Sequence, residues 1–152
     1  MGDITLTSQA DIDNFPTTYM GCTIMPYSIT IQEATMGNIM NLNGLAALVE
    51  IQGSLIIIDN EALNNLTGLS GVTSLGGELL IENNAALSSL NGLGAITGAI
   101  GGLSIGSNPV LTSISALGGL TSLDGVLNIG FNDALLDLTG LGSISTVVGY
   151  VR

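Results

Sequence analysis

The sequence contains no His, Lys or Trp, and its only Arg and only Cys are Arg152 and Cys22. Binding to DNA, RNA or an anionic membrane surface depends largely on Lys and Arg, so we expect none of these partners. Twelve acidic residues against one cation give a formal net charge of −11, which leaves almost no ion pairs to stabilise a fold. The acidic side chains instead keep an otherwise very apolar chain soluble by mutual repulsion.

Aromatic residues and long hydrophobic runs are also scarce. Only three Tyr and two Phe occur although 46% of the residues are hydrophobic, so the core must consist of Leu, Ile, Val and Ala. No run approaches the roughly 20 apolar residues of a membrane span, and we expect no membrane insertion. No signal peptide opens the chain, which indicates either a protein of the cell interior or a mature or trimmed form of an exported one.

Side chains that perform catalysis or bind metals are few. General acid–base catalysis near neutral pH usually needs His or a tuned carboxylate, and no pair of acids recurs in register, so we predict no enzyme and no catalytic residue. The acids near Asp59, Glu82 and Asp133 match neither an EF-hand nor a calcium-binding nonapeptide, so we predict no metal and no cofactor. Cys22 has no partner in the chain; we interpret it as a buried structural thiol, with a bridge to another segment or chain as the alternative.

What the sequence does contain is a repeat of 24 residues. The segment 73–96, TSLGGELLIENNAALSSLNGLGAI, resembles segments 49–72, 97–120 and 121–144, with no insertion between them. Self-similarity at a fixed period of this size is typical of a solenoid, in which each repeat is one unit stacked on the next. We therefore predict a mainly β fold, a parallel β-solenoid of 24-residue units that forms a single domain over residues 1–152.

The repeat places like residues in columns. Leu55 and Ile57 begin the pair of columns that should face inward from a strand, and a glycine precedes each strand. An Asn column follows three positions later, and we predict that its amides bond the turn backbone and one another as a structural ladder. Its members are Asn60, Asn84, Asn108 and Asn132. Four further apolar columns follow the Asn column in each unit and begin at Leu63, Leu66, Leu69 and Val72.

The two ends of the chain depart from the repeat. Residues 1–27 are predicted to form an N-terminal cap, with a strand over 3–7 and a short helix that begins near Ser8 and is ended by Pro16. Residues 28–48 form an irregular first unit, whose turn around 33–38 is two residues longer than later ones. Residues 145–152 begin another unit and leave it incomplete, so an apolar face and a strand edge should be exposed at this end.

Surface positions indicate an interface and a modification site. The outward strand residues Ile56, Ile58, Leu80 and Val126 should form an apolar stripe, and Tyr150 and Val151 should lie at the open end. We interpret these six residues as an interface. Asn65 is in the only N-x-S/T triplet, Asn65-Leu66-Thr67, and is a candidate glycosylation site if the source is eukaryotic.

The repeated pattern G-x-L-x-I-x-x-N-x-x-L-x-x-L-x-G-L-x-x-I resembles the receptor L-domain family of leucine-rich repeats, and is most similar to its secreted bacterial and protist members. Ser74 to Gly77, Asn84, Leu87, Leu90 and Gly92-Leu93 carry the resemblance, with the opening DITLTSQADIDNF. The resemblance implies a right-handed solenoid and an exported, non-enzymatic surface or matrix protein. The chain departs from the family in having only Cys22 where paired cysteines are common, and Ala116 in a glycine column.

Two functions remain open at this stage. The first is an extracellular structural or adhesive module on a cell surface, which self-associates head to tail through its open end and builds a fibre. The alternative is a monomeric recognition domain that binds a protein or glycan on the face of its parallel sheet, as the resemblance implies. Partners are therefore copies of the chain or other surface proteins and glycans.

Overall fold

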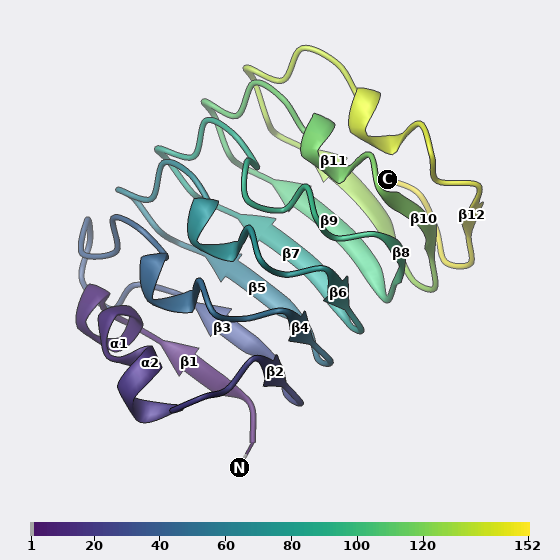
Figure 1. Ribbon diagram of the computed structural model, residues 1–152. Coiled ribbons are helices and arrows are strands. Elements are labelled where there is room, and N and C mark those ends of the chain that lie inside the picture. The colour runs from purple at the N-terminus through teal and green to yellow at the C-terminus, as the bar shows by residue number, and fades with distance from the viewer. Residues whose placement is uncertain (1) are drawn as a thin grey trace.

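The computed structural model of the protein describes residues 2–152 and is mainly β (Figure 1). Every strand pair in it is parallel, and the strands form one six-stranded sheet and two three-stranded sheets. The large sheet has the order β1 (Ile4–Leu6), β3 (Ile29–Ile31), β5 (Leu55–Ile58), β7 (Glu78–Glu82), β9 (Gly102–Gly106), β11 (Leu127–Gly130). The small sheets are β2 (Ile24–Met25), β4 (Glu50–Ile51), β6 (Ser74–Leu75) and β8 (Gly98–Ile100), β10 (Leu120–Leu123), β12 (Thr146–Val147).

Strand pairing in the large sheet follows the sequence period. Leu55 pairs with Leu79, and Leu79 pairs with Leu103, so equivalent residues of successive 24-residue units lie beside one another. Ile29 pairs with Leu55, a separation of 26 residues that absorbs the two extra residues of the first turn. The predicted stacking of equivalent strand residues is therefore confirmed, and the longer first turn with it.

The core lies between the large sheet and the turns opposite it, and it is built from apolar columns. Leu55, Leu79 and Leu103 are completely buried, as are Leu63, Leu87 and Leu111. Each buried Leu contributes roughly 1.5–3 kcal/mol of gross hydrophobic free energy. One unit alone would leave these side chains in water, because each column is covered only by the units on either side. Stability therefore depends on stacking.

A second strand in each unit was not predicted. Short strands such as β4 and β6 pair across successive units and direct Ile51 and Leu75 into the core. The pattern shifts in the unit 97–120, where Ile100 is buried and Ala99, the sequence equivalent of Leu75, is exposed. The register of β8 against β10 slips at this point, and Gly98 has a φ of 87°. The slip places the larger apolar side chain inside, and the short strands form two sheets instead of one.

Four 3-10 turns lie opposite the large sheet. Most of them contain a glycine, because the turn packs closely against backbone of the preceding unit. The turns are η1 (Asn43–Leu45), η2 (Thr67–Leu69), η3 (Ser115–Leu117) and η4 (Thr139–Leu141). Gly68 packs on the Leu42 carbonyl of the preceding unit so closely that a Cβ would overlap the oxygen. Ala116 occupies this column in η3. The unit beside it has a different bend, since no 3-10 turn forms there and Gly92 has a φ of 114°.

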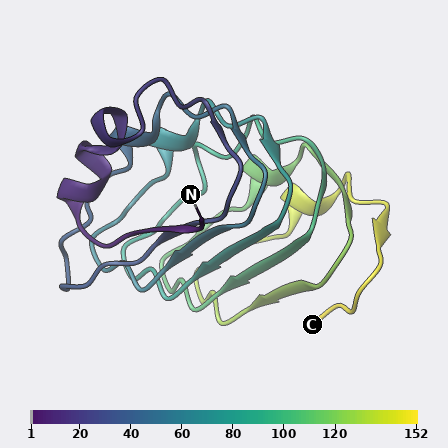
Figure 2. The same cartoon turned by 90° about the horizontal axis from the view of Figure 1, so that it is seen from below.

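Two short helices, α1 (Gln9–Asp13) and α2 (Phe15–Thr18), close the N-terminal end (Figure 2). Ser8 caps α1, because its Oγ accepts a hydrogen bond from the Asp11 backbone N–H at 3.2 Å. The prediction that Pro16 ends a single helix is wrong: the first helix ends at Asp13, and Pro16 lies in the first turn of the second. Proline fits there because its missing N–H has no intrahelical partner.

Candidate functional site

The Asn column forms a continuous chain of hydrogen bonds at the bend after each large-sheet strand. Asn60 Nδ2 donates to Asn84 Oδ1 at 2.9 Å, and Asn84 Nδ2 donates to Asn108 Oδ1 at 3.2 Å. The same Nδ2 of Asn84 also donates to the carbonyl oxygens of Ile57 and Glu82. Every buried polar side-chain atom in residues 2–152 has a partner, so this column has no free group to offer a ligand.

The residue before each Asn adopts a left-handed backbone conformation. Asp59, Asn83, Ser107 and Phe131 have φ between 55° and 57°. Asp and Asn tolerate this region well, whereas a bulky side chain there is strained. Phe131 is also 85% exposed, so its ring gains little from the core in return. An aromatic residue that is both strained and exposed does little to stabilise the folded chain, and backbone strain of this kind is often found at functional positions.

Glu33 ends the Asn column at the N-terminal side. Its backbone N–H donates to Asn60 Oδ1, and its carboxylate accepts backbone N–H groups of residues 37, 38, 39 and 61. Burial raises the pKa of Glu33, but these four hydrogen bonds outweigh it and lower the pKa below 4.5. Glu33 therefore holds the long first turn in place.

An acidic groove of about 350 Å³ lies beside Glu33 and is lined also by Asp59, Glu61 and Asn83. The carboxylate oxygens of Asp59 already accept hydrogen bonds from Gln32 Nε2 and Asn83 Nδ2. Within residues 2–152 no three His, Cys, Asp or Glu side chains are placed to share a metal ion. The carboxylates of Glu33 and Asp59 in this groove are engaged in hydrogen bonds that hold the turns in place.

The outward face of the large sheet is less apolar than expected. Ile56, Ile58, Leu80 and Val126 point outward as predicted, but each is half-buried among its neighbours. Further along the sheet the face becomes polar, where Asn128 Nδ2 donates to Ser104 Oγ and Ser104 Oγ donates to Glu82 Oε1. We call Glu82, Ser104 and Asn128 the polar strip of this face; Ser104 is only 6% exposed, and Gly102 and Gly106, which flank it on β9, are also buried.

Asn65 lies in a turn whose geometry recurs in each unit. Its Oδ1 accepts the backbone N–H and the hydroxyl of Thr67 at 3.1 and 2.6 Å, and the side chain is half-buried. Asp137 accepts the same two groups of Thr139, and Asn41, Ser89 and Ser113 each accept the backbone N–H two residues on. The turn accounts for the Asn and the Thr of this triplet, because the two side chains hydrogen-bond to each other there.

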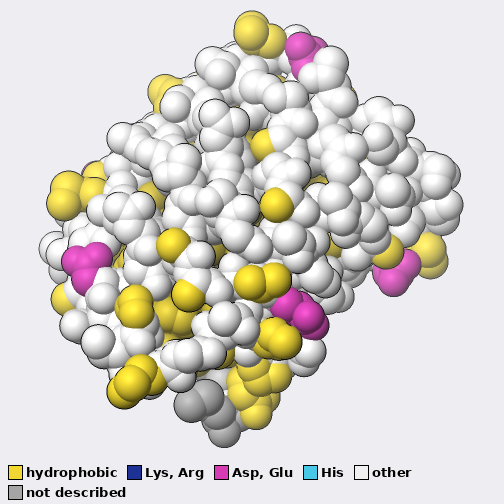
Figure 3. All heavy atoms as spheres, viewed as in Figure 1, with side chains coloured by type: hydrophobic (Ala, Val, Ile, Leu, Met, Phe, Trp, Pro, Cys, Tyr) yellow, Lys and Arg dark blue, Asp and Glu magenta, His cyan; other side chains and the backbone are white. Residues whose placement is uncertain are grey.

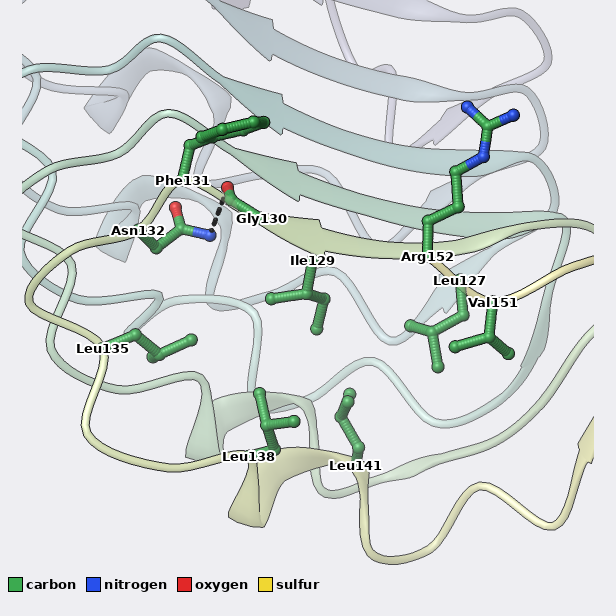
Figure 4. Close-up of a pocket in the computed structure, with 10 residues that line it drawn as sticks. All are labelled: Leu127, Ile129, Gly130, Phe131, Asn132, Leu135, Leu138, Leu141, Val151 and Arg152. Carbon is green, nitrogen blue, oxygen red and sulfur yellow. Dashed lines mark hydrogen bonds between the residues drawn. The ribbon is translucent and has the colours of Figure 1, made fainter.

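The C-terminal end differs from the rest of the molecule because its apolar columns are uncovered. We call this surface the C-terminal face; it comprises Leu127, Ile129, Phe131, Leu135, Leu138, Leu141, Val151 and Arg152. Leu138 is 53% exposed, whereas its equivalents Leu66, Leu90 and Ile114 are fully buried. The face is hollowed into a groove of about 350 Å³, with the aliphatic side chains directed into it (Figure 4).

The edge of the C-terminal face is formed by the last residues of the chain. Val151, which is 66% exposed, bridges to Leu127, and the Arg152 backbone N–H donates to the Leu127 carbonyl at 2.8 Å. The Arg152 guanidinium lies over the Tyr150 ring, 4.7 Å from its centroid. In Figure 4 Phe131 lies just beyond one end of β11, and Arg152 lies alongside the strand, where its backbone hydrogen-bonds to Leu127 and Ile129. The chain's only Arg therefore lies on this apolar groove.

Exposed hydrophobic side chains also occur elsewhere in residues 2–152. Hydrophobic side chains form small, separate patches on the side shown in Figure 3, most of them beside the N-terminal units. Cys22 is half-buried, and its Sγ lies 3.2 Å from the Ile24 carbonyl oxygen. No helix in residues 2–152 has the length and hydropathy needed to span a bilayer.

Sequence reasoning missed three features of these sites. Phe131 could have been found as the bulky residue in a column of Asp, Asn and Ser. Leu136 and Val148, 82% and 69% exposed, lie in or next to the last turns and had no distinguishing pattern. Glu33 follows a strand as Asn60 does, but its four donors come from turns that sequence alone does not place.

No protein-family model, curated protein or solved structure matches this chain. Functional inference therefore depends on the geometry of the C-terminal face and the sheet.

Proposed function

We propose that the protein is a right-handed, leucine-rich parallel β-solenoid similar to the receptor L-domain repeats. Support comes from the register of the large sheet, where strands separated by 24 residues pair in parallel, and from the Asn column at each bend. Each unit then turns once around the core and places its strand beside the previous one. This architecture exposes two ends and one broad sheet face to partners.

On this architecture the protein acts as a non-enzymatic structural or adhesive module of the cell surface, which self-associates. The observation behind this proposal is the C-terminal face, where Leu138 and Val151 are more than half exposed beside an apolar groove. Exposed apolar surface of this kind is unfavourable in water and is typical of a protein interface. The chain has no His and no Lys, and its single Arg is its only basic residue; this composition favours a structural role over catalysis.

Sedimentation velocity over a wide concentration range tests the proposal. We expect the monomer to give way to larger species as concentration rises, and a monomer at every concentration would contradict self-association. A Leu138→Asn variant places a polar amide on the face and should favour the monomer. Val110→Asn is the matched control, because Val110 is 43% exposed but lies outside the C-terminal face.

A recognition domain is the second candidate, and the polar strip on the large sheet favours it. The side chains of Glu82 and Asn128 are half-buried on the sheet face, and both hydrogen-bond to Ser104, which lies between them and is only 6% exposed. Such a strip presents the carboxylate of Glu82 and the amide of Asn128 to a protein or glycan ligand. Binding to a glycan array that is abolished by Asn128→Leu, in a protein that stays monomeric, would support this function instead.

A further inference from the structure

We propose that the stack of units opens transiently at one place, between units 73–96 and 97–120, with the large sheet as its hinge. We call this place the middle joint. Residues 2–96 and 97–152 then move as two blocks, joined along β7 and β9. This motion is a property of the folded chain that neither proposed function includes.

The small sheets are interrupted at the middle joint. β4 pairs with β6, and β8 pairs with β10, but across residues 2–152 no strand pair links β6 to β8. Gly98, which has a φ of 87°, donates its N–H to the Gly119 carbonyl of its own unit at 3.0 Å. The joints on either side are tied by two ladders of backbone hydrogen bonds, whereas the middle joint is tied by one.

The turns opposite the large sheet are interrupted here as well. The tetrapeptide Leu-Asn-Gly-Leu occurs at 42–45, where it contains the 3-10 turn η1, and again at 90–93, where no 3-10 turn forms. The second copy is closed by the Leu93 N–H on the Leu90 carbonyl, and the positive φ of Gly92 is typical of a type II turn. The Asn91 carbonyl accepts the Leu66 N–H at 3.1 Å, which ties unit 73–96 to the unit before it.

The large sheet, by contrast, is continuous across the middle joint. β7 and β9 lie side by side in Figure 1 and pair over five residues. Asn84 Nδ2 donates to Asn108 Oδ1 at 3.2 Å, and Ser104 Oγ donates to Glu82 Oε1 at 3.0 Å on the outer face. Because these bonds hold one side of the joint and the other side lacks its ladder, the blocks rotate about β7 and β9 and separate on the side of the small sheets.

Apolar packing keeps the middle joint closed most of the time. Ile96 and Ile100 lie beside it and are at most 2% exposed, so opening brings apolar side chains into water. The neighbouring joints would lose similar packing and a backbone ladder in addition, so they open less often. The open form is therefore a minor state of the folded protein.

Amide hydrogen exchange, followed by NMR, tests the proposal on two threonines of one column. The Thr97 N–H crosses the middle joint to the Thr73 carbonyl at 3.3 Å, and the Thr73 N–H crosses the preceding joint to the Val49 carbonyl at 2.8 Å. After correction for intrinsic rates, we expect Thr97 to exchange about tenfold faster than Thr73. Equal rates would overturn the proposal.

Amides on the large-sheet side test the hinge. The Asn83 N–H crosses the middle joint to the Gly106 carbonyl, and the Asp59 N–H crosses the preceding joint to the Glu82 carbonyl, both at 3.1 Å. We expect these two amides to exchange at similar rates. If Asn83 instead exchanges faster than Asp59 by the same factor as Thr97 over Thr73, the whole joint separates and the hinge is wrong.

A triple variant tests the cause of the opening. Gly98→Ser, Ala99→Leu and Ile100→Gly give unit 97–120 the residues T-S-L-G-G with which unit 73–96 begins, where Leu75 is buried and β6 is paired with β4. We expect the variant to pair β6 with β8 and to slow Thr97 to about the rate of Thr73. A folded variant in which Thr97 still exchanges fast would overturn the link between the interrupted sheet and the opening.

Discussion

Asn60 donates from Nδ2 to Oδ1 of Asn84 over 2.9 Å, and both side chains are completely buried. The same oxygen of Asn84 accepts the backbone N–H of Asn60 at 3.3 Å. One carboxamide therefore satisfies two donors of the preceding unit, while its Nδ2 donates to carbonyl oxygens of Ile57 and Glu82. The bends of successive units are thus tied together through side chains as well as through the sheet.

Replacement of Asn84 by Ala should be severely destabilising. The variant leaves two donors of Asn60 and the carbonyl oxygens of Ile57 and Glu82 without this partner inside the core. Each buried group left unsatisfied costs about 1–3 kcal/mol, so we expect a loss of about 3 kcal/mol or more in the free energy of unfolding. Urea denaturation measures it. Asn132→Ala is the control and should lose less, because Asn132 is half-buried and water can replace its bonds.

Glu33 should make stability depend on pH. Because its folded pKa lies below the ordinary 4.5, its contribution is fully present above pH 4.5 and is lost as pH falls through the folded pKa. Glu33→Gln keeps one accepting oxygen but removes the charge, and we expect a loss of about 2 kcal/mol near neutral pH. Thermal unfolding of both proteins from neutral to acidic pH should show the two curves converging at low pH. A constant difference across this range would contradict the assignment.

Relief of strain at Phe131 should stabilise the monomer. Phe131→Asn puts a residue that tolerates φ near 57° into the bend, and we expect a gain of about 1 kcal/mol in the free energy of unfolding. The measurement uses dilute protein, where association is absent. Leu136→Asn serves as control, since Leu136 is similarly exposed but has no positive φ, and it should change little. Loss of stability in Phe131→Asn would mean that the ring packs against its own chain.

A methyl group on Gly68 should not be tolerated. Its Cβ would overlap the Leu42 carbonyl oxygen, which belongs to backbone and cannot move aside without separating two units. We expect Gly68→Ala to lose about 3 kcal/mol or more, as overpacking against backbone does. Gly130→Ala is the matched control, because nothing lies within 4 Å of the added Cβ, and it should be neutral within about 0.5 kcal/mol. Equal effects at the two positions would show that close packing of units is not what selects glycine.

Much of the architecture was predictable, because a period of 24 residues is visible without any coordinates. The repeat identified which residues share a column, and columns such as Leu55, Leu79 and Leu103 pair as expected. Side-chain chemistry then indicated that the Asn column marks a bend. The second strand of each unit was not predictable, since strands of only two residues, such as β4 and β6, have no periodicity to detect.

The sequence by itself determined the column to which each residue belongs, because that depends only on spacing and on the alternation of apolar and polar side chains. Tertiary structure decided how each column is filled. Ile100 replaced Ala99 in the core because the larger side chain fills the available volume, and that volume is set by neighbouring units. The four backbone donors to Glu33 come together only when the units stack. The exposure and the positive φ of Phe131 likewise depend on the folded arrangement and are not visible in the sequence.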